Sequence, residues 1–270
     1  KFTFVKMVAS GNDFVIAENL KEDLPKLARE VCQRKTGIGG DGLLVLEKSR
    51  QADFRMRVFN PDGTEAEMCG NGARCIAVYL TTIKKLSKPH LVLETKAGLI
   101  EARVTKDNAQ INMGIPREID LDIPLDLAGR QVRVNFINTG VPHTVMFTED
   151  IRRIDVCGLG REIRYHPKFA PRGTNVNFVE QTKKDFIKVR TYERGVENET
   201  LACGTGTVAS SIITFLKSPL PKKKKGSFTM KALTLSTEVL KIHFDFKGDK
   251  IFNVWLEGRA RIVHSGVYYV

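Results

Sequence analysis

The sequence has 270 residues and 42% apolar content, enough for one large domain or two of ordinary size, each with a real core. It has no run of eighteen apolar residues of the kind that crosses a membrane as a helix. Its five scattered cysteines are too few for a disulfide framework, so a reducing compartment is expected. The net charge of +12 invites a nucleic-acid interpretation, but the lysine run at 222–225 lacks interleaved aromatic residues and indicates a solvated connecting loop.

The first half of the chain is predicted to form a sheet around a buried helix. Alternating or β-branched residues predict six short strands, at residues 2–8, 14–17, 43–47, 54–60, 91–95 and 99–104. A helix-like stretch spans 27–35, and the run ARCIAVYL at 73–80 is apolar on nearly every face. A helix that is apolar all round is a buried one, so the sheet is expected to wrap around it.

The second half follows the same plan. Its predicted strands lie at residues 132–138, 144–147, 175–180, 187–192, 240–246 and 251–256, and the run TVASSIITFL at 207–216 predicts a second buried helix. Prolines and alternating charges at 112–124 mark the boundary. The predicted fold is α+β, with two pseudo-symmetric halves, each a mixed or antiparallel sheet wrapped around a central buried helix. The halves are residues 1–114, to which 259–270 is expected to return, and residues 115–258.

Two motifs recur in the same order at nearly the same offset, close to half the chain length. The segments around Cys69 and Cys203 both run from a strand through a glycine turn and acidic residues to Cys-Gly-x-Gly and a helical stretch. Upstream, TGIGGDGLLVLE at 36–47 is echoed by RGTNVNFVE at 172–180. Two matches in one order indicate duplicated halves, which we expect to face each other.

The repeated cysteines are predicted to act as an acid and a base. At a helix start, the helix dipole and the free N–H groups stabilise a thiolate and lower the thiol pKa from its usual ~8.5. The flanking glycines allow those N–H groups to approach an anion such as a carboxylate. Two such sulfurs facing one carbon suit removal of a proton from one side and return of a proton on the other, which inverts the stereocentre.

Other candidate motifs are weaker. Cys32, Cys75 and Cys157 are interpreted as small hydrophobic residues, the commonest role of a free cysteine. No metal site is expected, because the cysteine and histidine spacings complete no set of four zinc ligands. The GIGGDG run at 37–42 precedes a strand instead of following one, the reverse of a dinucleotide-binding motif. His143 is expected to be a local structural histidine.

Five segments carry a family resemblance. The segments GNDF (11–14), FNPDGTEAEMCGNGARC (59–75), TGVPH (139–143), GTNVNF (173–178) and YERGVENETLACGTG (192–206) resemble, in this order and spacing, the diaminopimelate epimerase family. The resemblance covers nearly the whole chain. It implies a cofactor-independent isomerase of two pseudo-symmetric halves that interconverts LL- and meso-diaminopimelate in lysine and cell-wall synthesis.

The resemblance also implies the roles of individual residues. It makes Cys69 and Cys203 the catalytic pair. The implied substrate-binding residues, which supply backbone amides, side-chain amides and a distal charge pair, are Asn12, Asn60, Gly70, Asn71, Asn175, Glu193, Arg194, Gly204 and Thr205. The resemblance implies no cofactor and no metal.

An alternative is a related cofactor-independent racemase of another amino acid, which shares the cysteine pair and differs in its distal contacts. Val141 and Gly42 stand where many members of the family carry Asn and Gln, so both departures fall on substrate recognition. The expected partner is a small amino-acid substrate, with no nucleic acid and no membrane. The chain is expected to be a cytoplasmic homodimer, and since it begins at Lys1 without a Met, a preceding targeting segment is left open.

Overall fold

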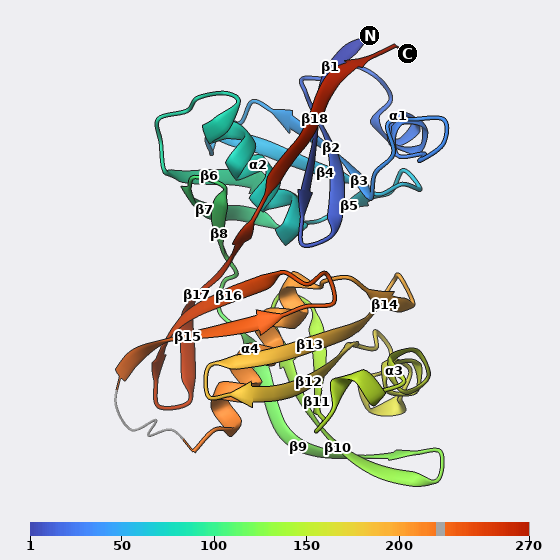
Figure 1. The fold of residues 1–270 in the computed structure, drawn as a ribbon, viewed down its shortest axis with the longest axis vertical. Helices are drawn as coiled ribbons and strands as arrows, with labels where there is room; N and C mark the ends of the chain where they lie inside the picture. Colours follow the sequence, from blue (N-terminus) through green and yellow to red (C-terminus); the bar gives the residue numbers. More distant parts are fainter. Residues whose placement is uncertain (220–224, 270) are drawn as a thin grey trace. The chain divides into compact units, whose positions relative to one another are not determined.

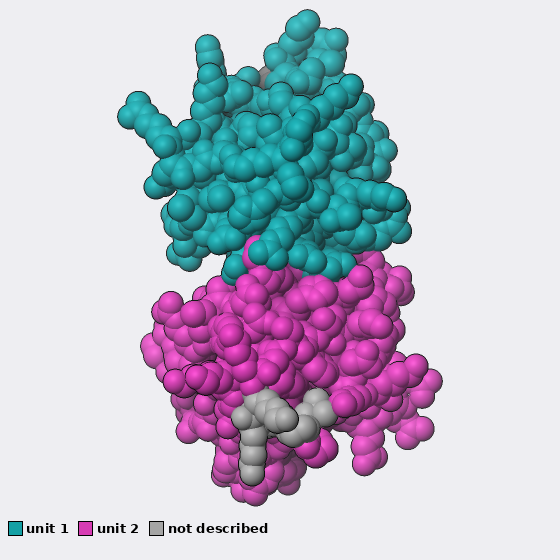
Figure 2. Space-filling model, turned by 90° about the vertical axis from the view of Figure 1, so that its left-hand side faces the viewer, with its two compact units in different colours: residues 1–112, 257–270 teal, residues 113–256 magenta. Residues whose placement is uncertain are grey.

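The computed structural model describes residues 1–219 and 225–269. The chain divides into two compact units, residues 1–112 with 257–270 and residues 113–256, coloured separately in Figure 2. Of the lysine run at 222–225, only Lys225 lies within the described residues, where it opens a strand. Within those residues, no helix is long and apolar enough to cross a membrane.

The first unit contains strands from both ends of the chain (Figure 1). Its elements are β1 (Phe2–Ala9), β2 (Asn12–Glu18), α1 (Leu24–Val31), β3 (Gly42–Glu47), β4 (Phe54–Phe59), β5 (Glu65–Ala66), α2 (Gly70–Thr82), β6 (His90–Thr95), β7 (Gly98–Thr105), β8 (Asn108–Asn112) and β18 (Arg261–Tyr268). Strand β1 lies antiparallel to β18 and β2, β2 runs parallel to β3, and β4 lies antiparallel to β3 and parallel to β6. Strands β7 and β8 complete the antiparallel end of the sheet.

The second unit repeats this order of pairing. Its elements are β9 (Arg117–Leu127), β10 (Arg130–Asn138), β11 (Pro142–Phe147), η1 (Ile151–Arg153), α3 (Val156–Arg164), η2 (Pro167–Phe169), β12 (Asn175–Lys183), β13 (Phe186–Glu193), β14 (Asn198–Thr200), α4 (Gly204–Lys217), β15 (Lys225–Leu233), β16 (Val239–Lys247) and most of β17 (Lys250–Arg259). Strand β11 runs parallel to β12, and β13 lies antiparallel to β12 and parallel to β15. These pairings match those of β2, β3, β4 and β6, and the predicted fold class of two similar α+β halves is confirmed.

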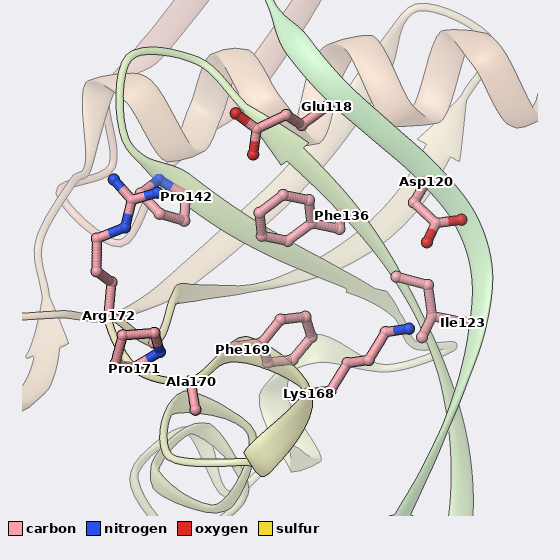
Figure 3. A pocket seen from close by; sticks show the side chains of 11 residues that line it. Glu118, Asp120, Ile123, Phe136, Pro142, Lys168, Phe169, Ala170, Pro171 and Arg172 are labelled. Atoms are coloured by element: carbon pink, nitrogen blue, oxygen red, sulfur yellow. The ribbon is translucent and has the colours of Figure 1, made fainter.

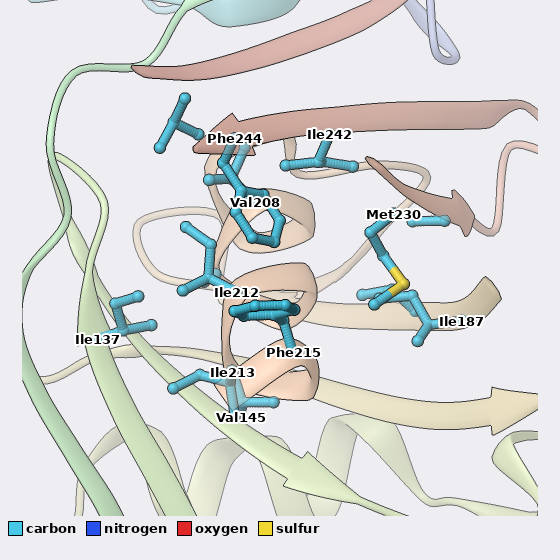
Figure 4. Packing of buried hydrophobic residues seen from close by; sticks show 14 of the residues in the cluster. Ile137, Val145, Ile187, Val208, Ile212, Ile213, Phe215, Met230, Ile242 and Phe244 are labelled. Atoms are coloured by element: carbon cyan, nitrogen blue, oxygen red, sulfur yellow. The ribbon is translucent and has the colours of Figure 1, made fainter. Parts of the chain in front are cut away.

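The central helices are buried along their whole apolar length, as their composition predicts. In α2, every residue from 71 to 80 is buried, and in α4 every residue from 206 to 216. Figure 4 shows the side chains of α4 inside a cluster contributed by the surrounding strands. At its centre the ring of Phe215 lies 4.9 to 5.1 Å from those of Phe228, Phe244 and Phe246, an arrangement that adds aromatic contact energy to simple burial.

Residues 112–124, interpreted from the sequence as a boundary, also contain a strand that was not predicted. Strand β9 begins at Arg117 and pairs with β10 through a long antiparallel register. The first six residues of β9 are exposed, and burial alternates only over its second half, where Ile123, Leu125 and Leu127 are buried. Pro124 stands opposite Arg133, a placement that strands near a sheet edge tolerate.

The first helix also differs from its predicted range of 27–35. It begins at Leu24, where the side chain of Asp23 accepts a hydrogen bond from the N–H of Lys26, and it ends at Val31. Every predicted strand overlaps an observed one. Helix α3 and the strands β5, β8, β9, β14, β15 and β18 were not predicted.

Candidate functional site

Each repeated cysteine is the N-cap residue of a central helix. Cys69 precedes α2 in an extended conformation, and its Sγ accepts a hydrogen bond from the N–H of Gly72 at 3.4 Å. Cys203 precedes α4 in the same conformation and is 7% exposed, and its Sγ lies 3.4 Å from Oγ1 of Thr205. The first N–H groups of a helix have no acceptor within the helix, so each sulfur stands beside a cluster of amide donors at the positive end of a dipole.

The asparagines of the first unit are not equivalent. Nδ2 of Asn71 donates to Oδ1 of Asn12 at 2.5 Å, which places both amides beside the start of α2. Asn60 is exposed in the turn after β4, and its Nδ2 donates to Oγ1 of Thr64 at 2.9 Å. Asn12 is therefore hydrogen-bonded to Asn71 in the Cys69 motif, whereas Asn60 stabilises the turn in which it lies.

In the second unit, hydrogen bonds place Asn175 beside Arg194 and connect Thr205 to the turn before β11. Oδ1 of Asn175 accepts from the N–H of Arg194 at 2.9 Å, and its Nδ2 donates to the carbonyl of Pro142 at 3.0 Å. Oγ1 of Thr139 donates to the carbonyl of Thr205 at 3.0 Å and ties the first turn of α4 to the turn before β11.

Glu193 and Arg194 are neighbouring charged residues, and the side chains of both are partly buried. Burial raises the pKa of Glu193, against a smaller opposing effect of its hydrogen bond from Thr200. Burial also lowers the pKa of Arg194, and the charges of Arg164 and Arg172 act in the same direction. Both groups would therefore gain from a ligand of opposite charge.

His143, predicted to be a local structural histidine, belongs to a buried hydrogen-bond network. It is fully buried in β11, and burial together with the charge of Arg194 lowers its pKa to about 3, so the ring is neutral at physiological pH. Its Nδ1 lies 3.1 Å from Nδ2 of Asn177, whose Oδ1 accepts from Thr191 and whose Nδ2 also donates to the carbonyl of Thr144. Nδ1 must accept from the amide, which leaves the proton on Nε2, and no partner for Nε2 is found in the described part of the chain. Asn177 was not predicted from the sequence.

The remaining cysteines divide into two kinds. Cys32 and Cys75 are buried, as interpreted, and burial raises the pKa of Cys32 to about 11. The interpretation of Cys157 as a buried hydrophobic residue is wrong. Its side chain is exposed near the start of α3, and its Sγ lies 3.1 Å from Oδ1 of Asn198.

A cavity of about 240 Å³ opens between β9, β10 and the loop around η2 in the second unit (Figure 3). The stacked rings of Phe136 and Phe169 lie 5.7 Å apart on one side, and charged side chains stand at its rim. Its lining includes Pro142 and Gly173, which belong to the segments TGVPH and GTNVNF, but neither repeated cysteine. A cavity without either sulfur cannot host the predicted proton transfers, so we do not place the site there.

Comparison with known proteins gives consistent matches along the chain. A family model described as diaminopimelate epimerase matches residues 4–119 and 135–244. The curated diaminopimelate epimerase of Aquifex aeolicus is 41% identical over 97% of this chain and 96% of its own length. The diaminopimelate epimerase of Methanocella arvoryzae is 37% identical over 98% and 96%.

Solved structures of other families have the same fold. A probable proline racemase from Agrobacterium radiobacter gives a TM-score of 0.71 at 15% identity, with 100% of this chain and 93% of that one covered. A phenazine biosynthesis protein of the PhzF family from Bacillus anthracis gives a TM-score of 0.73 at 16% identity, with 100% of this chain and 99% of that one covered. At such identities the likeness concerns the fold alone.

Proposed function

This chain belongs to the diaminopimelate epimerase family, and on that premise we propose that Cys69 and Cys203 together invert an α-carbon of the substrate. The activity is the interconversion of LL- and meso-2,6-diaminopimelate, an isomerisation that belongs to lysine biosynthesis. The observation that carries the residue assignment is the matched placement of both sulfurs at the N-caps of the two central helices.

The proposed reaction is a two-base proton exchange. One cysteine, as thiolate, removes the α-proton and becomes a thiol, while the other, as thiol, delivers its proton to the opposite face of the same carbon and becomes a thiolate. No proton is gained or lost overall, and the two sulfurs exchange roles for the reverse direction. This scheme requires that each sulfur face one side of the same substrate carbon.

Charge that develops at the α-carbon spreads into the adjacent carboxylate. Backbone amides of Gly70, Asn71, Gly204 and Thr205 are proposed to hold that carboxylate, because first-turn N–H groups are already oriented before the reaction begins. Such preorganised donors supply electrostatic stabilisation without a cofactor.

The distal end of the substrate is a second amino acid group, with its own ammonium and carboxylate. We assign the ammonium to Glu193 and the carboxylate to Arg194, with Asn175 holding the backbone between them, since its Oδ1 accepts the N–H of Arg194. Asn12 and Asn60 complete the proposed substrate contacts from the first unit.

A substrate panel tests this assignment. Exchange of α-hydrogen for deuterium in D₂O is expected to be at least about 100-fold faster with LL-diaminopimelate than with lysine, glutamate or histidine, because those amino acids leave Glu193 or Arg194 without its ligand. Proton NMR of the α-position measures the exchange. Comparable or faster exchange with one of the other three amino acids would favour the related racemase instead.

We further propose that the chain acts in the cytoplasm as a homodimer, as its family resemblance implies. Exposed aliphatic side chains on β18, among them Val263 and Val267, support a protein contact there. Size-exclusion chromatography with light scattering is expected to give about twice the mass of one 30.3 kDa chain. A single-chain mass at micromolar concentration would contradict the dimer.

A further inference from the structure

The two asparagines beside Cys69 form a directed hydrogen-bond chain. Nδ2 of Asn71 donates to Oδ1 of Asn12, and Nδ2 of Asn12 donates to Oδ2 of Asp41 at 3.3 Å. At the other end, Nη2 of Arg74 donates to Oδ1 of Asn71 at 2.5 Å and to Oγ of Ser10 at 2.8 Å. Every link therefore runs in one direction, from the guanidinium to the carboxylate.

The two ends of this chain determine its direction. An arginine can only donate, so Asn71 must turn its oxygen toward Arg74 and its nitrogen toward Asn12. An ionised carboxylate can only accept, so Asn12 must turn its nitrogen toward Asp41 and its oxygen toward Asn71. An isolated pair of asparagines has no such preference, because each amide can present either its oxygen or its nitrogen to the other.

Both ends are themselves held in place. Arg74 is fully buried in α2, and its Nη1 also donates to the carbonyl of Arg259 at 3.3 Å. Oδ1 of Asp41 accepts from Nη2 of Arg34 at 2.7 Å, and the same guanidinium bonds both carboxylate oxygens of Asp13. Burial pushes the pKa of Asp13 upward, but hydrogen bonds from Arg34 and Lys6 outweigh it and lower that pKa, which keeps the Asp13 carboxylate charged.

We propose that Asp41 and Arg74 are positioning residues that lock the Asn12–Asn71 pair in its donor orientation. Each Nδ2 carries two hydrogens, of which the chain uses one, and no acceptor for the second is found among residues 1–219 and 225–269. These two N–H groups add to the backbone amides of the first turn of α2. These N–H groups are all donors, which favours a carboxylate over a neutral amide at this place.

This inference rests on the proposed function and refines it, because it assigns the carboxylate preference of the first unit to two charged residues that do not themselves touch the substrate. Asp41 stands in the glycine run at 37–42, to which the sequence alone assigned no role, because its order is the reverse of a dinucleotide-binding motif. Arg74 is the single charge in an otherwise apolar helical run, a placement that a buried helix retains only when the charged group is hydrogen-bonded, here to Asn71, Ser10 and the carbonyl of Arg259.

The first test replaces one end of the chain. Asp41→Asn substitutes a group that can donate or accept, so the KM for diaminopimelate is expected to rise about tenfold or more, the scale of one hydrogen bond to a charged group, with kcat within about threefold. Asp53→Asn is the matched control, because Asp53, like Asp41, pairs with a basic side chain and accepts a backbone N–H in the same unit, but it contacts neither asparagine. It is expected to change thermal stability and leave KM unchanged.

A second measurement distinguishes a change in the orientation of the Asn12–Asn71 amides from a general loosening of the structure around them. The diamide of diaminopimelate can donate or accept, so its inhibition constant should change less than threefold in Asp41→Asn, while the KM of the dicarboxylate rises. Equal weakening of both ligands would mean that Asp41 has only a structural role and would overturn the proposal.

The other end is tested by a pair of variants. Arg74→Lys keeps a donor-only group and is expected to retain KM within about threefold, whereas Arg74→Gln removes the constraint and is expected to raise KM at least tenfold. Circular dichroism establishes whether each variant folds. If neither Arg74 variant folds, the result for Asp41→Asn alone decides whether the proposal holds. An Asp41→Asn enzyme with the parental KM would overturn this inference alone, whereas a parental enzyme that does not epimerise diaminopimelate would overturn the proposed function.

Discussion

Replacing either Cys69 or Cys203 with alanine is expected to lower the rate of conversion of LL- to meso-diaminopimelate by at least about 10³-fold, because in the proposed scheme each sulfur serves one face of the carbon. The fold should remain, since both residues are N-caps at the ends of helices whose stability comes from burial along their length. Chiral chromatography of the product measures inversion, and NMR in D₂O measures exchange. The single-cysteine enzymes are expected to lose inversion even where slow exchange at one face persists.

A matched control is available in the same helix. Cys75 is buried in α2 and does not cap it, so Cys75→Ala should retain inversion within about fivefold while it lowers thermal stability. If Cys203→Ala converted the LL isomer at the parental rate, the two-base scheme would be wrong. Loss of inversion in Cys75→Ala to the same extent would show that the cysteine effects are structural.

Alanine at Gly206 is expected to be far more damaging than alanine at the corresponding Gly72. A Cβ at Gly206 would lie 2.2 Å from Oδ1 of Asn177, a contact that cannot exist without movement. Asn177 cannot easily yield, because its amide is held by His143, Thr144 and Thr191. The first turn of α4 must shift instead, and with it the N-cap sulfur of Cys203.

We expect Gly206→Ala to cost about 1–3 kcal/mol of stability and about 10²-fold in kcat/KM, since displacement of a catalytic group by an ångström has effects of that order. At Gly72 the nearest atom to an added Cβ is Cδ2 of Leu44 at 3.0 Å, the end of a side chain that can rotate. Gly72→Ala should therefore reduce kcat/KM by less than tenfold. Thermal melts and steady-state kinetics of both variants provide the comparison, and equal effects at the two glycines would contradict the role of Asn177.

The two Cys-Gly-x-Gly motifs show which features of the fold could be predicted from local sequence. Both the helix that follows each cysteine and its burial could be predicted, because apolar residues on every face have only one stable location, inside a sheet. Family membership, inferred from five motifs in order, was confirmed by relatives about 40% identical over nearly the whole chain. Strand β9 was missed because the prolines and alternating charges of residues 112–124 indicated a boundary, and the burial of Ile123 and Leu125 became visible only in the structure.

By itself, the sequence determined the element plan of two similar halves, the two cysteines that begin their central helices, and the family that these motifs define. These features depend on periodicity and on short motifs, which involve residues close together in the sequence. Only the tertiary structure decided which asparagines join the cysteine motif, that His143 is buried and neutral, and that Asp41 and Arg74 terminate one hydrogen-bond chain. Those relations link residues far apart in sequence, and the direction of a hydrogen bond depends on partners that folding alone brings within reach.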